Sequence, residues 1–153
     1  MNTTSDPGPA PSPAPRPPGE ATSLRGLPAV VVHGRADIAA VLSRGRGATL
    51  LSARGAALFA GVGWWRALVA DARADWPGVA FDDVLDCADA PGRVVEALRL
   101  GQRAMVLDPG CAAWPALRAL ALHEGAVLLG TRPAALDLGE RGAGRKLGAW
   151  LGG

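Results

Sequence analysis

Residues 79–108 constrain the fold of this 153-residue chain more than any other stretch. The stretch opens with an apolar segment that ends at Val84-Leu85-Asp86, and Pro91 then begins a pattern of apolar residues at helical spacing. Gly101 suits the left-handed residue that follows a helix, and residues 104–107 form an apolar run typical of a strand buried on both faces. The strand, helix and strand make a βαβ unit, whose two strands should lie parallel in one sheet.

The same alternation of strand and helix is repeated along the chain. Five apolar segments are expected to be strands, and a helical pattern or turn follows each: residues 29–32, 49–51, 79–85, 104–107 and 126–129. This order predicts an α/β fold with about five parallel strands. The folded part, residues 28–138, is too short for a closed eightfold barrel, which typically takes ~250 residues. We expect half of a TIM barrel, with an open flavodoxin-like sheet as the alternative.

Two flanking segments have a different composition from the repeats. Residues 1–27 are rich in Pro and Ala, and such a tail buries too little apolar area to offset its ordering entropy, so we expect it to be disordered. Residues 139–153 are Gly-rich, and we expect a tail with a short helix at residues 145–151.

Composition narrows the function classes. The net charge is only +2 and the basic residues are spread along the chain, which does not favour nucleic-acid binding. No apolar run reaches the ~18 residues of a membrane span. The two cysteines come without secretion cues, so we expect reduced thiols and a cytoplasmic location.

Polar residues follow the ends of the expected strands, whereas the strand bodies are almost wholly apolar. Because the carboxyl ends of parallel strands meet at one edge, ligands of α/β proteins bind there. We therefore expect a ligand site built from eight residues: His33, Ser52, Arg54, Asp86, Asp89, Asp108, Thr131 and Arg132. The competing interpretation is that these residues are helix caps and turn formers, which strand-to-helix connections need in any protein.

Individual roles follow from the chemistry of the side chains. Asp86 comes directly after the apolar pair Val84-Leu85, and its carboxylate is suited to accept a proton, so it is the catalytic candidate. The alternative for Asp86 is an anchor for neighbouring backbone N–H groups. Arg54 and Arg132 are suited to hold an anionic group. Cys87 is a candidate zinc ligand together with His33 and Cys111, although no CxxC or HxxxH spacing accompanies it.

The central unit resembles the class II fructose-bisphosphate aldolases, which are zinc-dependent barrel enzymes. In that family a strand ending His-Leu-Asp-His-Gly is followed by a helix and then by Gly-Phe-x-Ser-Val-Met-x-Asp. This chain has Val84-Leu85-Asp86-Cys87-Ala88 and, after the helix, residues 101–108, GQRAMVLD; residues 49–56, TLLSARGA, resemble the family's second strand and its following loop. The likeness covers roughly residues 30–110.

The resemblance implies a barrel-type half in which Asp86 corresponds to the proton-transferring aspartate and Cys87 replaces a zinc-binding histidine. The chain ends before any equivalent of the family's later zinc histidines and phosphate loops. The resemblance therefore implies a catalytically reduced, aldolase-like domain that binds a small anionic metabolite at the carboxyl edge of its sheet.

Two other functions stay open on the sequence. One is an active metal-dependent aldolase or lyase that oligomerisation completes, and the other is a non-enzymatic interaction or scaffold protein. A half-barrel would leave sheet edges and apolar surface exposed, so in that case we expect a homo-oligomer.

Overall fold

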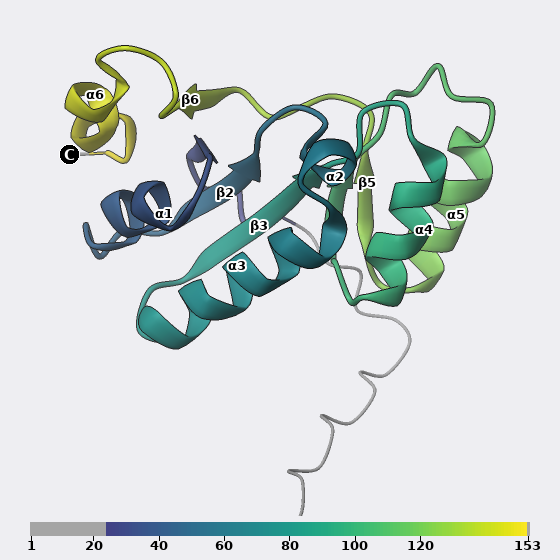
Figure 1. Ribbon diagram of the computed structural model, residues 1–153, viewed down its shortest axis with the longest axis horizontal. Helices are drawn as coiled ribbons and strands as arrows, with labels where there is room; N and C mark the ends of the chain where they lie inside the picture. Colours follow the sequence, from purple (N-terminus) through teal and green to yellow (C-terminus); the bar gives the residue numbers. More distant parts are fainter. Residues whose placement is uncertain (1–23, 153) are drawn as a thin grey trace, which may run out of the picture.

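The computed structural model describes residues 24–152, which form an α/β fold with one parallel sheet (Figure 1). The predicted fold class is confirmed. The first 23 residues of the predicted tail lie outside the described residues. In chain order the elements are β1 (Ala29–Val32), α1 (Arg35–Leu42), β2 (Ala48–Ser52), α2 (Ala56–Phe59), α3 (Val62–Asp75), β3 (Phe81–Asp86), α4 (Pro91–Arg99), β4 (Ala104–Val106), α5 (Trp114–His123), β5 (Val127–Leu129), β6 (Ala135–Asp137) and α6 (Ala143–Trp150).

The six strands lie in the order β5-β4-β3-β2-β1-β6. Strands β1 to β5 follow one another in chain order, as consecutive strands of a half-barrel do, whereas β6 lies on the far side of β1, as in an open sheet whose order reverses there. The sheet is consistent with both predicted arrangements. The sheet has six strands where about five were expected, and β6 is the additional strand. Helix α6 begins two residues before the helix predicted at residues 145–151.

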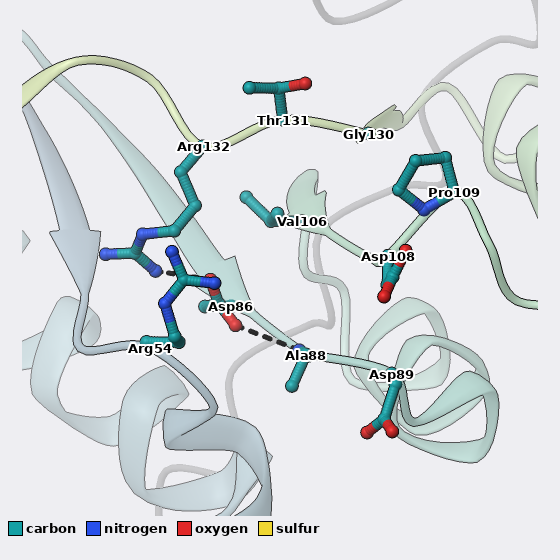
Figure 2. Close-up of a pocket in the computed structure, with 10 residues that line it drawn as sticks. All are labelled: Arg54, Asp86, Ala88, Asp89, Val106, Asp108, Pro109, Gly130, Thr131 and Arg132. Atoms are coloured by element: carbon teal, nitrogen blue, oxygen red, sulfur yellow. Dashed lines mark hydrogen bonds and ion pairs between the residues drawn. The ribbon is translucent and has the colours of Figure 1, made fainter.

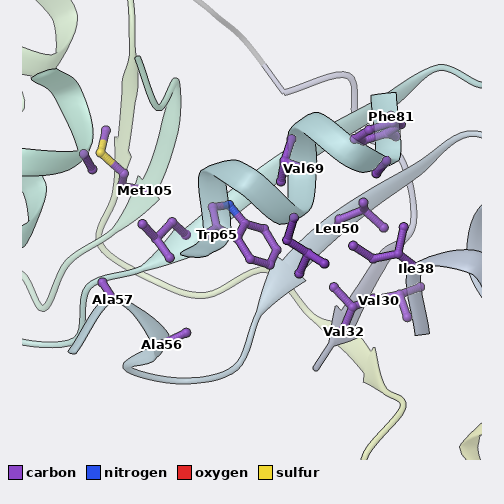
Figure 3. Close-up of a cluster of buried hydrophobic side chains, with 14 of the residues drawn as sticks. Val30, Val32, Ile38, Leu50, Ala56, Ala57, Trp65, Val69, Phe81 and Met105 are labelled. Carbon is purple, nitrogen blue, oxygen red and sulfur yellow. The ribbon is translucent and has the colours of Figure 1, made fainter. Parts of the chain in front are cut away.

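The helices all contribute to a single core, which lies on one face of the sheet. Side chains from every helix pack there with alternate strand residues such as Val30, Leu50 and Met105. Trp65 of α3 is fully buried at the centre of this core, among the neighbours drawn in Figure 3, although its indole N–H has no hydrogen-bond partner within residues 24–152. Helix α3 is therefore fixed to the sheet by apolar burial, with Trp65 as the largest of its five buried side chains.

The opposite face of the sheet carries a smaller apolar cluster that no described helix covers. Its buried members come from the strands, and Leu24 of the segment before β1 packs against them. Residues 24–27, which were predicted within the tail, therefore contact the sheet, and the backbone N–H of Arg25 donates to Asp82 at 2.8 Å.

The linker between β5 and β6, residues 130–134, shows that the sheet is curved. From Leu129 to Ala135 the chain takes six steps, which span at most ~22 Å when fully extended. Strands β5 and β6 are five strand spacings apart, which is ~24 Å in a flat sheet. The sheet must therefore curve for the linker to reach, and the linker crosses near the carboxyl ends of the intervening strands (Figure 1).

No helix among residues 24–152 is both long enough and apolar enough to cross a membrane.

Candidate functional site

A cavity of about 590 Å³ lies at the carboxyl edge of the sheet, between the ends of β3 and β4 and the β5–β6 linker (Figure 2). Six of the eight residues predicted to bind a ligand line it: Arg54, Asp86, Asp89, Asp108, Thr131 and Arg132. The strand ends bring these residues together from four separate loops. Most of the polar residues that were expected to share one edge of the sheet therefore lie around one cavity.

Asp86, the last residue of β3, is buried and fully engaged in hydrogen bonds. Its Oδ1 accepts the backbone N–H groups of Gly55 at 2.8 Å and Ala88 at 2.9 Å. Gly55 has a φ of 69°, in the left-handed region, which lets the loop after β2 turn its N–H toward this carboxylate. Asp86 thus holds two loops in place, which is the anchoring role that the sequence left open beside catalysis.

Arg132 links the β5–β6 linker to the ends of two strands. Its Nη1 donates to Asp86 Oδ2 and its Nη2 donates to the carbonyl oxygen of Ser52 at 3.0 Å. The Asp86 side chain is 2% exposed and that of Arg132 is 17% exposed, so the ion pair is largely shielded from water. The guanidinium neutralises the buried carboxylate and fastens the linker over the strand ends.

Ser52 lies beneath the cavity and does not line it. Its hydroxyl accepts the backbone N–H of Asp86 at 2.9 Å and donates to the carbonyl of Ala53 at 3.1 Å, and the residue is fully buried. The structure therefore gives Ser52 a bracing role between β2 and β3.

The remaining charged residues that line the cavity differ in how many hydrogen bonds or ion pairs their side chains already make. Arg54 is exposed, and its guanidinium has no hydrogen bond or ion pair with any residue the structure describes; Figure 2 shows it extending toward the Asp86–Arg132 pair. Asp108 Oδ1 accepts the backbone N–H of Gly110 at 2.8 Å, which forms the turn after β4. Asp89 is exposed and also lines the cavity.

These contacts give the cavity a mixed charge. The Asp86 and Arg132 charges neutralise each other, which leaves the guanidinium of Arg54 and the carboxylates of Asp89 and Asp108. A ligand with one anionic group would find its partner in Arg54. A hydroxyl or amino group on the same ligand would find an acceptor in Asp108.

His33 lies elsewhere along the same edge, after β1. Its Nε2 is 2.6 Å from Asp137 Oδ1 at the end of β6, and its backbone N–H donates to Asp37 at 2.8 Å. Burial opposes ionisation of Asp137, but hydrogen bonds from His33 and from the backbone N–H of Gly139 lower the pKa of this carboxyl. Asp137 was not predicted, because its only sequence signal is a carboxylate after a very short apolar segment.

Cys87, the candidate zinc ligand, is turned into the hydrophobic core and does not line the cavity. Burial, and then the neighbouring Asp86 carboxylate, raise the pKa of its thiol to about 12. Cys111, the other cysteine, is half-buried and free. Within residues 24–152 no three His, Cys, Asp or Glu side chains gather as a metal site would require.

Comparisons of the chain with protein-family models, with curated proteins and with solved structures found no match.

Proposed function

We propose that this protein is a catalytically reduced α/β domain that binds a small anionic metabolite in the cavity at the carboxyl edge of its sheet. The observation that carries the proposal is the guanidinium of Arg54, a charged group that faces a cavity of about 590 Å³ and has no partner among the described residues. Arginine forms two parallel hydrogen bonds with a carboxylate or phosphate, so it selects an anionic group.

The carboxylates in the cavity refine the class of ligand. Asp89 and Asp108 would repel a molecule that is anionic throughout, because like charges in one site oppose binding. A molecule that joins one carboxylate to hydroxyl or amino groups fits better, with the carboxylate beside Arg54 and the hydroxyl or amine beside Asp108. Hydroxy acids and amino acids have this arrangement.

The bonding of Asp86 supports binding over catalysis. A general base must accept a proton from the substrate, yet both oxygens of Asp86 already accept hydrogen bonds, and one of them is paired with Arg132. In the proposed function Asp86 shapes the cavity without reacting. The strand order of β1 to β5 and the placement of the helices on one face are consistent with a half-barrel.

Isothermal titration calorimetry of the full chain with lactate and with serine tests this function. Lactate joins one carboxylate to a hydroxyl, and serine joins one carboxylate to a hydroxyl and an amine. We expect saturable binding of at least one of them, and Arg54→Gln should weaken it about tenfold or more, since a hydrogen-bonded charge contributes ~1.5–3 kcal/mol.

Arg118→Gln is the matched control, because Arg118 is exposed on α5, does not line this cavity and carries the same charge. The affinity of the Arg118→Gln variant for the bound probe should equal that of the natural chain. If neither probe binds at millimolar concentration, or if the two variants lose affinity equally, Arg54 does not hold an anion in this cavity.

Self-association is a second property that we propose, and a specific observation favours it. Three large apolar side chains stand at the start of α3 and on α2: Leu58 is 47% exposed, Phe59 72% and Trp64 39%. A second copy of the chain would remove this surface from water. Light scattering after size exclusion should give a dimer or larger that Phe59→Ser dissociates, and a monomer at high concentration would contradict the proposal.

A further inference from the structure

A second cavity, of about 310 Å³, lies at the amino edge of the sheet, beside the starts of β3 and β4. We propose that this cavity binds a small phosphate-bearing molecule. It shares no lining residue with the cavity at the carboxyl edge. Four arginines and two aspartates are among its lining residues: Arg25, Arg66, Arg73, Arg103, Asp82 and Asp83.

The cavity exists because β3 and β4 pair over only part of their length. Strand β3 pairs with β2 from Phe81 onward, whereas its pairing with β4 begins at Leu85. The first four of the six residues of β3 thus have no strand partner on the β4 side. The buried side chain of Gln102 bridges part of this gap, donating to the carbonyl of Asp83 at 3.3 Å and to that of Ala104 at 2.9 Å. The space that is left opens between the two strand starts.

Positive charge is in excess around this space. The Asp83 carboxylate, whose side chain is 9% exposed, accepts hydrogen bonds from Arg73 and from Gln102, both at 2.8 Å. Asp82 accepts from the backbone N–H of Arg25 and lies 3.5 Å from its guanidinium. Four arginines and two aspartates therefore line this space, which leaves a formal surplus of two positive charges. An anion would neutralise this surplus.

Three of the guanidinium groups are held in position by contacts that leave most of their donors unused. Arg66 Nη1 donates to Gln102 Oε1 at 3.3 Å. The guanidinium of Arg73 lies over the ring of Phe81, with its carbon 4.4 Å from the ring centre. Arg103 Nη1 donates to the carbonyl of Glu124 at 2.7 Å.

A guanidinium has five N–H donors, so each of these side chains keeps donors for a ligand. Their planar shape matches the oxygen pairs of phosphate, which arginine binds in a two-point fashion. Because their positions are already fixed, binding costs less side-chain entropy than it would for free arginines. The surplus of two positive charges favours a phosphate group, which carries up to two negative charges, over a carboxylate, which carries one.

The test is isothermal titration calorimetry of the full chain with inorganic pyrophosphate at constant ionic strength. We expect saturable binding of one pyrophosphate per chain. Arg103→Gln should weaken it about tenfold or more, and Arg103→Lys should bind with intermediate affinity, because it keeps the charge but loses the two-point geometry. Circular dichroism checks that each variant folds, and Arg25→Gln replaces Arg103→Gln if that variant does not.

Two controls assign the binding to this cavity. Arg118→Gln removes one positive charge from α5 and should leave the affinity for pyrophosphate unchanged. Arg54→Gln alters the other cavity and should also leave it unchanged. The proposal is overturned if pyrophosphate does not bind saturably, if Arg118→Gln weakens binding as much as Arg103→Gln, or if Arg54→Gln abolishes binding, which would place the anion at the carboxyl edge.

Discussion

The guanidinium of Arg132 donates to the buried carboxylate of Asp86, and this contact joins the β5–β6 linker to the end of β3. The two residues are 46 positions apart in the chain. Asp86 also holds the N–H groups of Gly55 and Ala88. One carboxylate therefore sets the relative positions of three segments around the proposed binding cavity.

Removing the charge of Asp86 should destabilise the fold. In Asp86→Asn the side-chain oxygen can still accept a backbone N–H, but Arg132 is left largely buried without its counter-charge. Breaking one side of a buried ion pair costs about 3 kcal/mol or more. Urea denaturation followed by circular dichroism should show this as a lower midpoint with an unchanged slope.

Asp89→Asn is the control for that variant, because this substitution removes the same charge from an exposed residue in the loop after β3. Its free energy of unfolding should change by no more than ~0.5 kcal/mol. Equal midpoints for Asp86→Asn and the natural chain would show that the ion pair does not fasten the linker.

The reactivity of the two thiols should differ sharply in the native state. Burial raises the pKa of Cys87 to about 12, so almost no thiolate exists there at neutral pH, whereas Cys111 is half-exposed. Titration with a disulfide reagent should label one thiol per native chain and two per unfolded chain. Cys111→Ser should abolish the native labelling. Rapid labelling of both thiols in the folded protein would be incompatible with the burial of Cys87.

Asp137 should contribute to the acid dependence of stability. Its folded-state pKa is lowered from the ordinary 3.8, chiefly by the hydrogen bonds from His33 and Gly139 against the opposing effect of burial. A depressed pKa adds stability that is fully present above the ordinary value and is lost as pH falls through the folded value. The stability difference between the natural chain and Asp137→Asn should therefore be constant at mildly acidic pH and shrink below about pH 4. A difference that grows on acidification would contradict this assignment.

Trp65 should be the most sensitive core position on α3. Trp65→Ala removes a fully buried ring and should lower the free energy of unfolding by about 3–5 kcal/mol. Trp65→Phe should cost clearly less, because it keeps a buried aromatic ring and removes an indole N–H that has no partner among the described residues. Denaturant titration of the two variants provides the comparison, and equal losses would argue against tight packing around the ring.

The sequence predicted elements that depend on local pattern. The buried strand Ala29–Val32 and the helix beginning at Pro91 were expected where they occur, because apolar runs and a proline at a helix start are local signals. Strand β6 is only three residues long and lies next to Gly-rich sequence, so it has almost no pattern of its own. Its place beside β1 depends on tertiary pairing.

The sequence predicted which edge of the sheet carries the polar residues, but not which of their side chains line the cavity. Polar residues after strands were expected at one edge, but which side chain faces the cavity depends on alternation along the strand. Asp86 and Cys87 are adjacent, so they point to opposite faces, and Cys87 lies in the core. The pairing of His33 with Asp137 joins residues 104 positions apart, which a local pattern cannot indicate.

The central claim is that the cavity at the carboxyl edge holds a small anionic metabolite through Arg54. The most direct test is two-dimensional nitrogen–proton NMR of the ¹⁵N-labelled chain, titrated with lactate and with serine. We expect saturable shifts with at least one of them, confined to the backbone amides around the cavity, at Gly55, Ala88 and residues 130–132, and we expect Arg54→Gln to abolish them. Absent shifts with both compounds at millimolar concentration, or shifts scattered over the surface and unchanged in Arg54→Gln, would contradict the claim.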